Sequence, residues 1–332
     1  MLRALARHTL LMGTFFAFVL IGLSPAAAQM TVDDVPQGFD TVIGVNFDEI
    51  RESPLYDRAI TMARSQPGID HMLAELESSM DIDISTDLTS LLVASEFPPL
   101  NQRMLSSPAA AMQGAAQGSG NTFAVVTGAF DSHSILQKLS EDHDGERPLD
   151  LDGRNTTLVA MDSDKLAIFM GDGSFRDGAM DLLSTTGALD DKYQQGLQSL
   201  GDRSGIFLLT SPNIDDEELA EEADASFVGL AMSGGPRNVH ISTLVTLSDE
   251  ESASAMLEEV DEARTQAAQN PLISLFGVRP LLDNLSLQQD GHHVFMETTM
   301  PNRNALRLAQ RLGNILENQA ELQQPLGNDG DD

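Results

Sequence analysis

The chain has 332 residues, and its 51 Asp and Glu residues far outnumber its 19 Lys and Arg residues, giving a net charge of −32 at pH 7. This charge would repel a phosphate backbone or an anionic lipid surface, which argues against nucleic acid and membrane surfaces as partners. Cationic partners and dissolved cations are favoured instead. The absence of cysteine excludes disulfides, thiolate metal sites and a thiol nucleophile.

Aromatic residues are scarce, although an apolar fraction of 41% is enough to build a core for one large or two medium domains. There is no Trp, and Tyr56 and Tyr193 are the two tyrosines. Binders of carbohydrate and of single-stranded nucleic acid use aromatic platforms, so both ligand classes are disfavoured.

Residues 1–28 have the three parts of a cleavable export signal. Arg3 and Arg7 supply the positive start, residues 9–23 form an apolar run, and Ala26–Ala28 supply small residues for cleavage. The run is shorter than the roughly 20 residues of a membrane-spanning helix. We expect the leader to be removed, leaving a mature chain in the periplasm or the extracellular medium without stable membrane insertion. An uncleaved membrane anchor is the alternative.

The charge pattern resembles that of proteins from salt-loving organisms, because acids abound while Lys138, Lys165 and Lys192 are the only lysines. Surface carboxylates repel one another over a Debye length of about 30 Å at 0.01 M salt, which shrinks to about 3 Å at 1 M. We therefore expect this halophilic-like protein to be stabilised by salt.

The first half of the chain predicts strands alternating with helices. Strands are expected over residues 41–47, 89–94, 122–130, 156–160 and 166–170. Helices are expected after the N-cap residues Asp48 and Asp131, around 73–80 and over 174–184. A strand, Phe, Asp and a helix follow one another at Phe47–Asp48 and again at Phe130–Asp131, 83 residues later, which indicates a weak internal repeat.

Residues 97–121 have too few large apolar side chains to offset the entropy of ordering, so we expect a long mobile surface loop. A glycine-rich phosphate cradle is the functional alternative. The segment lacks both the G-x-x-x-x-G-K-[ST] pattern and any lysine.

The second half predicts three strands, a long helix, a fourth strand and a final helix. The strands are expected over 206–210, 227–232, 239–247 and 294–300, with a tight turn at 233–236. Ser248 to Glu251 reads as a capping box for a helix that ends at Asn270–Pro271. A helix follows from Asn302, and residues 319–332 form a disordered acidic tail.

The predicted fold class is α+β, with an antiparallel or mixed sheet and helices packed on one side. We expect two related lobes, over residues 29–200 and 201–318, after the signal peptide 1–28 and before the tail 319–332.

The opening of the mature chain, Pro36-Gln-Gly-Phe-Asp-Thr-Val-Ile-Gly-Val-Asn46, is followed by Ser53-Pro-Leu-Tyr56 and by Asp83-Ile-Ser-Thr-Asp-Leu88. In these motifs, and in the order of its elements, the chain resembles uncharacterised exported bacterial proteins of domain-of-unknown-function families. The resemblance implies an exported location and a fold of repeated α+β lobes. It implies no active residue.

Two groups of carboxylates are the candidates for a metal site, because calcium prefers oxygen ligands from short acidic loops. They comprise Asp81, Asp83, Asp87, Asp162, Asp164 and Asp172. Paired carboxylates could also exchange protons if one were buried enough to stay protonated. Ordinary acidic turns are the competing interpretation.

Two further Asp-x-Asp-Gly segments, Asp142–Gly145 and Asp150–Gly153, resemble part of a calcium loop. Placing either glycine at the sixth loop position puts Leu151 or Val159 where a bidentate Glu is required, so the pattern fails.

Other catalytic motifs are absent from the sequence. There is no H-E-x-x-H zinc motif, although His240 and His293 could approach each other if their strands pair. There is no G-x-S-x-G or S-x-x-K motif for a serine nucleophile.

No catalytic residue and no cofactor is therefore predicted. The favoured function is that of an exported, non-enzymatic binding or envelope-associated protein whose partner is another protein or a small molecule. The alternatives are an exported hydrolase that uses carboxylate or metal-assisted chemistry, and a carrier that holds an apolar ligand between sheet and helices.

Overall fold

The computed structural model describes residues 32–51, 53, 56, 61, 77, 82–83, 85–96, 121–141, 149–151, 154–171, 173–185, 189–201, 205–211, 225–235, 237–269 and 279–307. Four sequence predictions lie outside these residues: the leader, the loop that precedes Asn121, the helix around 73–80 apart from Glu77, and the acidic tail.

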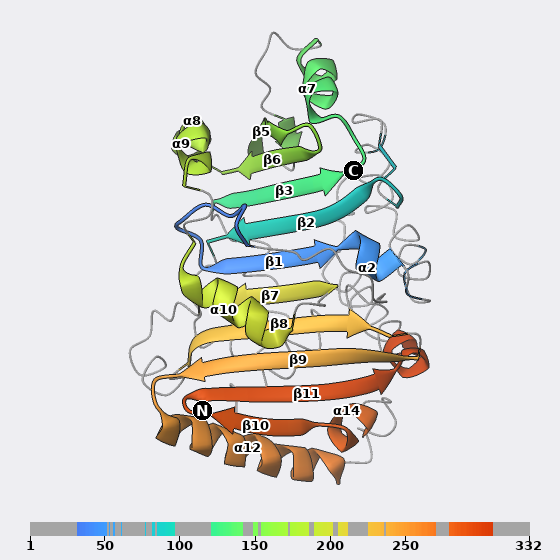
Figure 1. The fold of residues 1–332 in the computed structure, drawn as a ribbon, viewed down its shortest axis with the longest axis vertical. Coiled ribbons are helices and arrows are strands. Elements are labelled where there is room, and N and C mark those ends of the chain that lie inside the picture. The colour runs from blue at the N-terminus through green and yellow to red at the C-terminus, as the bar shows by residue number, and fades with distance from the viewer. Residues whose placement is uncertain are drawn as a thin grey trace, which may run out of the picture.

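All strands that the structure describes belong to one antiparallel sheet of eleven, in the order β10-β11-β9-β8-β7-β1-β2-β3-β6-β5-β4 (Figure 1). Their bounds are β1 Thr41–Asn46, β2 Leu88–Ser95, β3 Thr122–Gly128, β4 Leu149–Leu151, β5 Arg154–Asp162, β6 Lys165–Met170, β7 Ile206–Thr210, β8 Ala225–Gly234, β9 Asn238–Leu247, β10 Ser286–Asp290 and β11 His293–Pro301. The predicted α+β class and antiparallel sheet are confirmed.

The described helices are mostly short. They are α2 Phe47–Arg51, α7 Ser132–Glu141, α8 Gly173–Asp177, α9 Ala179–Leu183, α10 Asp191–Leu200, α12 Glu250–Ala268 and α14 Arg279–Asp283. Residues 302–307 are also helical, as predicted from Asn302 onward. None of the helices within the described ranges is long and apolar enough to cross a membrane.

The sheet is continuous across the lobe boundary that was expected at residue 200. Strand β1 pairs with β7, with Thr41 opposite Thr210 and Val45 opposite Ile206. Helix α10, which precedes that boundary, contacts β7, β8 and β9, which follow it. The two halves of the chain therefore share one sheet.

The helices lie on both faces of the sheet rather than on one side as expected. On the front face in Figure 1, α10 and the segment before β1 cover a core that includes Val42, Phe123, Phe169 and Phe207. On the back face, α12 covers Val245 and Val294, and α7 covers Leu166. Because successive side chains of a strand alternate between faces, almost every strand has apolar residues on both sides, and both faces need a cover.

The strand order repeats between the two halves of the chain. The first half runs β1-β2-β3-β6-β5 from the centre outward, and the second half runs β7-β8-β9-β11-β10. In each half a helix follows the third strand, α7 in the first and α12 in the second. Figure 1 shows α7 and α12 at opposite ends of the sheet.

The N-caps of these two helices match as well, 118 positions apart in the sequence. Asp131 accepts hydrogen bonds from the backbone of His133 and the hydroxyl of Ser134, and Asp249 accepts one from the backbone of Ser252. These bonds hold the pKa of both carboxyl groups below the usual value. The Phe47–Asp48 motif follows a central strand instead, so the 83-residue spacing does not relate equivalent positions.

Two predicted caps are corrected by the structure. Asp249, rather than Ser248, is the N-cap of α12. The side chain of Asn46, rather than that of Asp48, accepts a hydrogen bond from the backbone of Glu49 at the start of α2. The capping residue lies one position after the predicted one in α12 and two positions before it in α2, within the one or two residues by which helix ends commonly differ.

Candidate functional site

Four of the six predicted metal ligands lie at one corner of the sheet. Asp81 and Asp172 lie outside the described residues, whereas Asp83 and Asp87 precede β2 and Asp162 and Asp164 lie at the β5–β6 turn. The end of β3 joins the two turns, because Gly128 and Ala129 donate backbone hydrogen bonds to the carbonyls of Asp164 and Asp87.

The carboxylates at this corner are used to form turns. Asp83 accepts hydrogen bonds from the backbone and the hydroxyl of Ser85, and Asp87 accepts one from the backbone of Asp83 at 2.8 Å. Within the part of the chain that the structure describes, no three His, Cys, Asp or Glu side chains are placed to hold a metal ion. Of the calcium-like segments, Asp142–Gly145 and Asp152–Gly153 lie outside that part, and Asp150 belongs to β4.

His240 and His293 do not meet, although their strands pair as anticipated. In the β9–β11 ladder, His240 lies opposite Thr299 and His293 lies opposite Thr246. Six residues of strand separate the two positions, which is about 20 Å. His293 instead stacks on His292, with ring centroids 4.1 Å apart, and its Nδ1 lies 3.0 Å from the Thr246 hydroxyl.

A different site lies on the front face, beside α10. It is a shallow pocket of about 370 Å³, which we call the Tyr193 pocket. Its walls come from the segment before β1, from the start of α10 and from the residue after β7. The lining residues are Gln37, Gly38, Phe39, Asp40, Leu189, Asp190, Lys192, Tyr193 and Ser211.

Helix α10 begins and lies where it does for local reasons. The Asp190 side chain accepts a hydrogen bond from the backbone of Lys192 at 3.1 Å and so caps the helix. Tyr193, Leu197 and Leu200 are buried at helical spacing and turn one stripe toward the sheet. Gly196 lies in the same stripe and lets the helix approach the Phe227 ring closely.

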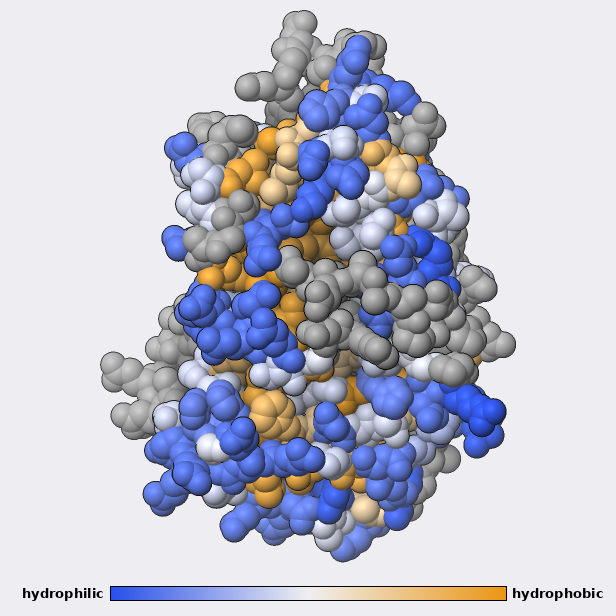
Figure 2. Space-filling view, viewed as in Figure 1, coloured by the Kyte–Doolittle hydropathy of each residue, from blue (hydrophilic) through white to orange (hydrophobic). Residues whose placement is uncertain are grey.

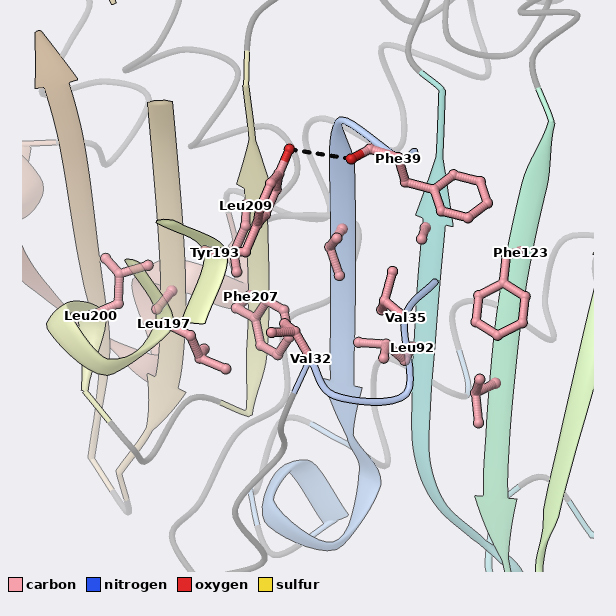
Figure 3. Close-up of a cluster of buried hydrophobic side chains, with 14 of the residues drawn as sticks. Val32, Val35, Phe39, Leu92, Phe123, Tyr193, Leu197, Leu200, Phe207 and Leu209 are labelled. Atoms are coloured by element: carbon pink, nitrogen blue, oxygen red, sulfur yellow. Dashed lines mark hydrogen bonds between the residues drawn. The ribbon is translucent and has the colours of Figure 1, made fainter. Parts of the chain in front are cut away.

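The segment before β1 lies across the front of the sheet and forms the opposite wall. Val32, Val35 and Phe39 are buried there against the central strands, as Figure 3 shows. An ion pair of 2.9 Å between Asp34 and Lys165 of β6 holds the segment in place. Figure 2 shows this face, with hydrophilic residues over α10 and hydrophobic ones in the gaps beside it.

Tyr193 joins the walls of the pocket. Its hydroxyl donates to the carbonyl of Asp40 at 2.6 Å and lies 3.2 Å from the Ser211 hydroxyl. A longer contact, at 3.5 Å, reaches the carbonyl of Phe39 and is drawn in Figure 3. The Asp40 carbonyl also accepts from the backbone of Ser211 at 2.8 Å. Three segments that are distant in sequence are thereby fixed around one point.

Tyr193 and Asp190 keep their ordinary protonation states at neutral pH. Burial raises the pKa of the Tyr193 hydroxyl, so this group stays protonated and donates at neutral pH. The bond from the Lys192 backbone lowers the pKa of Asp190, which therefore stays ionised. The Lys192 ammonium lies 3.4 Å from that carboxylate and 5.5 Å from the centre of the Tyr193 ring.

The core beneath this pocket is filled by side chains. Phe207, Leu209 and Val42 of the sheet are each at most 1% exposed, and Tyr193 above them is 2% exposed. The Tyr193 and Phe227 rings meet edge to face at 5.5 Å. Packed side chains, rather than space for an apolar ligand, therefore lie between α10 and the sheet.

Reasoning from the sequence missed both α10 and the pocket. The sequence does contain the pattern of this helix, since Asp190 is a good N-cap residue and Tyr193, Leu197 and Leu200 follow at helical spacing. No sequence pattern indicates the pocket, because its walls lie about 150 residues apart and only the β1–β7 pairing brings them together.

No protein-family model and no curated protein matches this sequence. Among solved structures, the chain is similar to crystal form I of TP0453, with 11% identity and a TM-score of 0.45 over 87% of this chain and 99% of that one. It is also similar to crystal form III of TP0453, with 13% identity and a TM-score of 0.43 over 87% of this chain and 100% of that one.

Proposed function

We propose that this chain is an exported, non-enzymatic binding protein that holds a small zwitterionic ligand in the Tyr193 pocket. The observation that carries the proposal is the lining of this pocket, which combines an ammonium group, carboxylates and hydroxyl groups with the apolar side chains of Phe39 and Leu189. A compact zwitterion has an ammonium and a carboxylate group of its own and can pair with both kinds of charge.

The geometry of the walls supports this proposal. Lys192 can meet a ligand carboxylate at the start of α10, where the helix dipole also favours negative charge. Asp40 and Asp190 can meet a ligand ammonium group. The segments are already joined by the hydrogen bonds of Tyr193, so little ordering would be required on binding.

Export is supported by the leader pattern in residues 1–28. Cell fractionation and N-terminal sequencing of the protein from its host test this part. We expect it outside the cytoplasm with Gln29 as its first residue, and a cytosolic full-length chain would contradict the proposal.

Calorimetric titration of the purified protein with glycine, glycine betaine and L-lysine tests the ligand class. We expect saturable binding of at least one zwitterion and a loss of at least tenfold in affinity in Lys192→Ala. The matched control is Gln195→Ala, an exposed position on the same helix outside the pocket, which should bind like the parent. Absence of binding at millimolar concentration, or equal affinity in both variants, would refute the assignment of this pocket.

A hydrolase panel tests the non-enzymatic part of the proposal. Turnover of any substrate that is abolished by one carboxylate or histidine substitution would show that the protein is an enzyme after all.

A further inference from the structure

The two ends of the sheet differ in one strand. In the first half, β5 is followed outward by β4, which pairs with it antiparallel through Leu149 opposite Thr156 and Leu151 opposite Arg154. In the second half, β10 occupies the place that β5 has in the first half. No strand within the described residues pairs with the outer edge of β10 or takes the position equivalent to β4.

The outer edge of β10 presents backbone groups for pairing. The backbone N–H of Leu247, at the end of β9, donates to the carbonyl of His292, so the carbonyl of His292 faces β9. Backbone groups of successive residues point to opposite sides of a strand, so the N–H and C=O of His293 face β10, where Asp290 lies opposite. By the same alternation, the N–H and C=O groups of Leu287 and Gln289 point away from β11.

A groove runs beside this edge, between β10 and α12. We call it the edge groove; its volume is about 480 Å³, and it is lined by Leu257, Glu258, Asp261, Glu262, Arg264 and Leu287. Figure 1 shows α12 lying along β10 at this end of the sheet. Leu257 and Leu287 are half-buried and supply an apolar surface.

The charge around the edge groove is negative. Glu258, Asp261 and Glu262 contribute three carboxylates, and Arg264 is the one cation among the lining residues. That cation is already held, because its guanidinium lies 2.5 Å from Asp261 and donates to the carbonyl of Leu285 at 3.1 Å. Three carboxylates and one guanidinium leave the lining with a formal charge of −2, which attracts a positive partner.

We propose that the outer edge of β10 accepts an extended, cationic segment of a partner protein, which adds to the sheet as an antiparallel strand in the place that β4 fills in the first half. Alternate side chains of the added strand would enter the edge groove, where apolar residues meet Leu257 and Leu287 and basic residues meet the carboxylates. A second copy of this chain fits poorly, because it would bring another acidic edge to an acidic groove.

The test uses synthetic peptides with capped ends, binding to the purified protein by calorimetry. The probe, Val-Thr-Lys-Thr-Val-Thr-Lys-Thr, places valine and lysine in turn on one face of the strand, and its matched control has glutamate in place of lysine. We expect the lysine peptide to bind at least tenfold more tightly. Equal binding of the two peptides, or no binding of the lysine peptide, would overturn the proposal.

Strand addition is separated from simple charge attraction by N-methylation. One copy of the lysine peptide carries N-methyl groups on its odd residues and another on its even residues. An added strand uses only one set of alternate amides, so one copy should bind and the other should not. Equal affinity of both copies would show that charge alone holds the peptide and would refute strand addition.

Protein variants locate the site. The double variant Glu258→Gln and Glu262→Gln should weaken binding of the lysine peptide severalfold. The control, Asp33→Asn with Asp181→Asn, removes two exposed carboxylates outside the groove and should bind like the parent. If both double variants lose affinity equally, overall charge attracts the peptide and the edge groove is not the site.

Discussion

The hydroxyl of Tyr193 donates a hydrogen bond of 2.6 Å to the carbonyl of Asp40, which fastens α10 to the residue that precedes the central strand β1. The same carbonyl accepts from the backbone of Ser211, directly after β7. This point therefore joins the two halves of the chain at the centre of the sheet, on the face that carries the Tyr193 pocket.

Substitution Tyr193→Phe tests this link. The ring remains, so packing against Phe227 is kept, but the carbonyl of Asp40 loses one of its two donors. We expect the free energy of unfolding to fall by about 1–2 kcal/mol, the range for a lost hydrogen bond at a buried group. Urea denaturation followed by circular dichroism measures the change, with Gln195→Ala as the control. An unchanged midpoint would show that the bond contributes nothing net.

Gly196 decides how closely α10 lies on β8. A methyl group at this position would come within 2.4 Å of the Phe227 ring, which is 3% exposed. Alanine favours a helix by about 1 kcal/mol over glycine, whereas overpacking costs about 1–3 kcal/mol. We expect Gly196→Ala to be destabilising overall, because the contact falls on a buried ring.

The melting temperature of Gly196→Ala, compared with that of Gln195→Ala, measures this effect. The control gains helix propensity without entering the interface, so it should melt at or slightly above the parent temperature. A Gly196→Ala protein more stable than the parent would mean that α10 can move away from β8 at little cost.

The sequence predicts best those elements that form from neighbouring residues. The bounds of β7 match the predicted 206–210, and the hairpin of β8 and β9 follows from two β-rich runs around the predicted turn at 233–236. The first two residues of that predicted turn, Ser233 and Gly234, belong to β8. Helix α12 is found because its apolar stripe, including Ala253, Met256 and Val260, repeats over several turns.

The features that the sequence does not predict depend on contacts between residues that are far apart in the chain. The register of β9 against β11 is one case, since the chain between them passes through α12 and no tight turn fixes which residues face each other. His240 and His293 therefore pair with threonines and not with each other. Strand β10 is another case, because its sequence, Ser-Leu-Gln-Gln-Asp, has one apolar residue and belongs to an edge.

His293 should make stability depend on pH. Burial, with a smaller contribution from the charge of His292, holds the pKa of His293 below the usual 6.5. The unfolded chain therefore binds a proton at a higher pH than the folded chain. The free energy of unfolding that depends on neutral His293 is fully present above pH 6.5. It declines as the pH falls below that value, toward the folded-state pKa.

Urea denaturation at several pH values between 5 and 7.5 tests the role of His293. Because the carboxylates of the chain also begin to titrate in acid, the informative quantity is the difference in slope between the parent and His293→Gln. We expect the variant to lose less stability on acidification than the parent. The control, His240→Gln, changes an exposed histidine on β9 and should keep the parent slope; equal slopes in all three proteins would contradict the prediction.

Salt should raise the melting temperature at pH 7. With 51 acidic and 19 basic residues, the folded chain brings many like charges together, and mobile ions screen their repulsion. We expect a steep rise from low salt to about 1 M NaCl, the range over which the Debye length shrinks from tens of ångströms to about 3 Å. Differential scanning calorimetry measures the curve.

The same titration near pH 4.2, the isoelectric point, is the matched control, since little net charge remains to be screened there. A steeper rise at pH 7 than at pH 4.2 separates charge screening from the general effect of salt on apolar burial. A flat or falling curve at pH 7 would show that other contacts in the fold already offset the repulsion among its carboxylates.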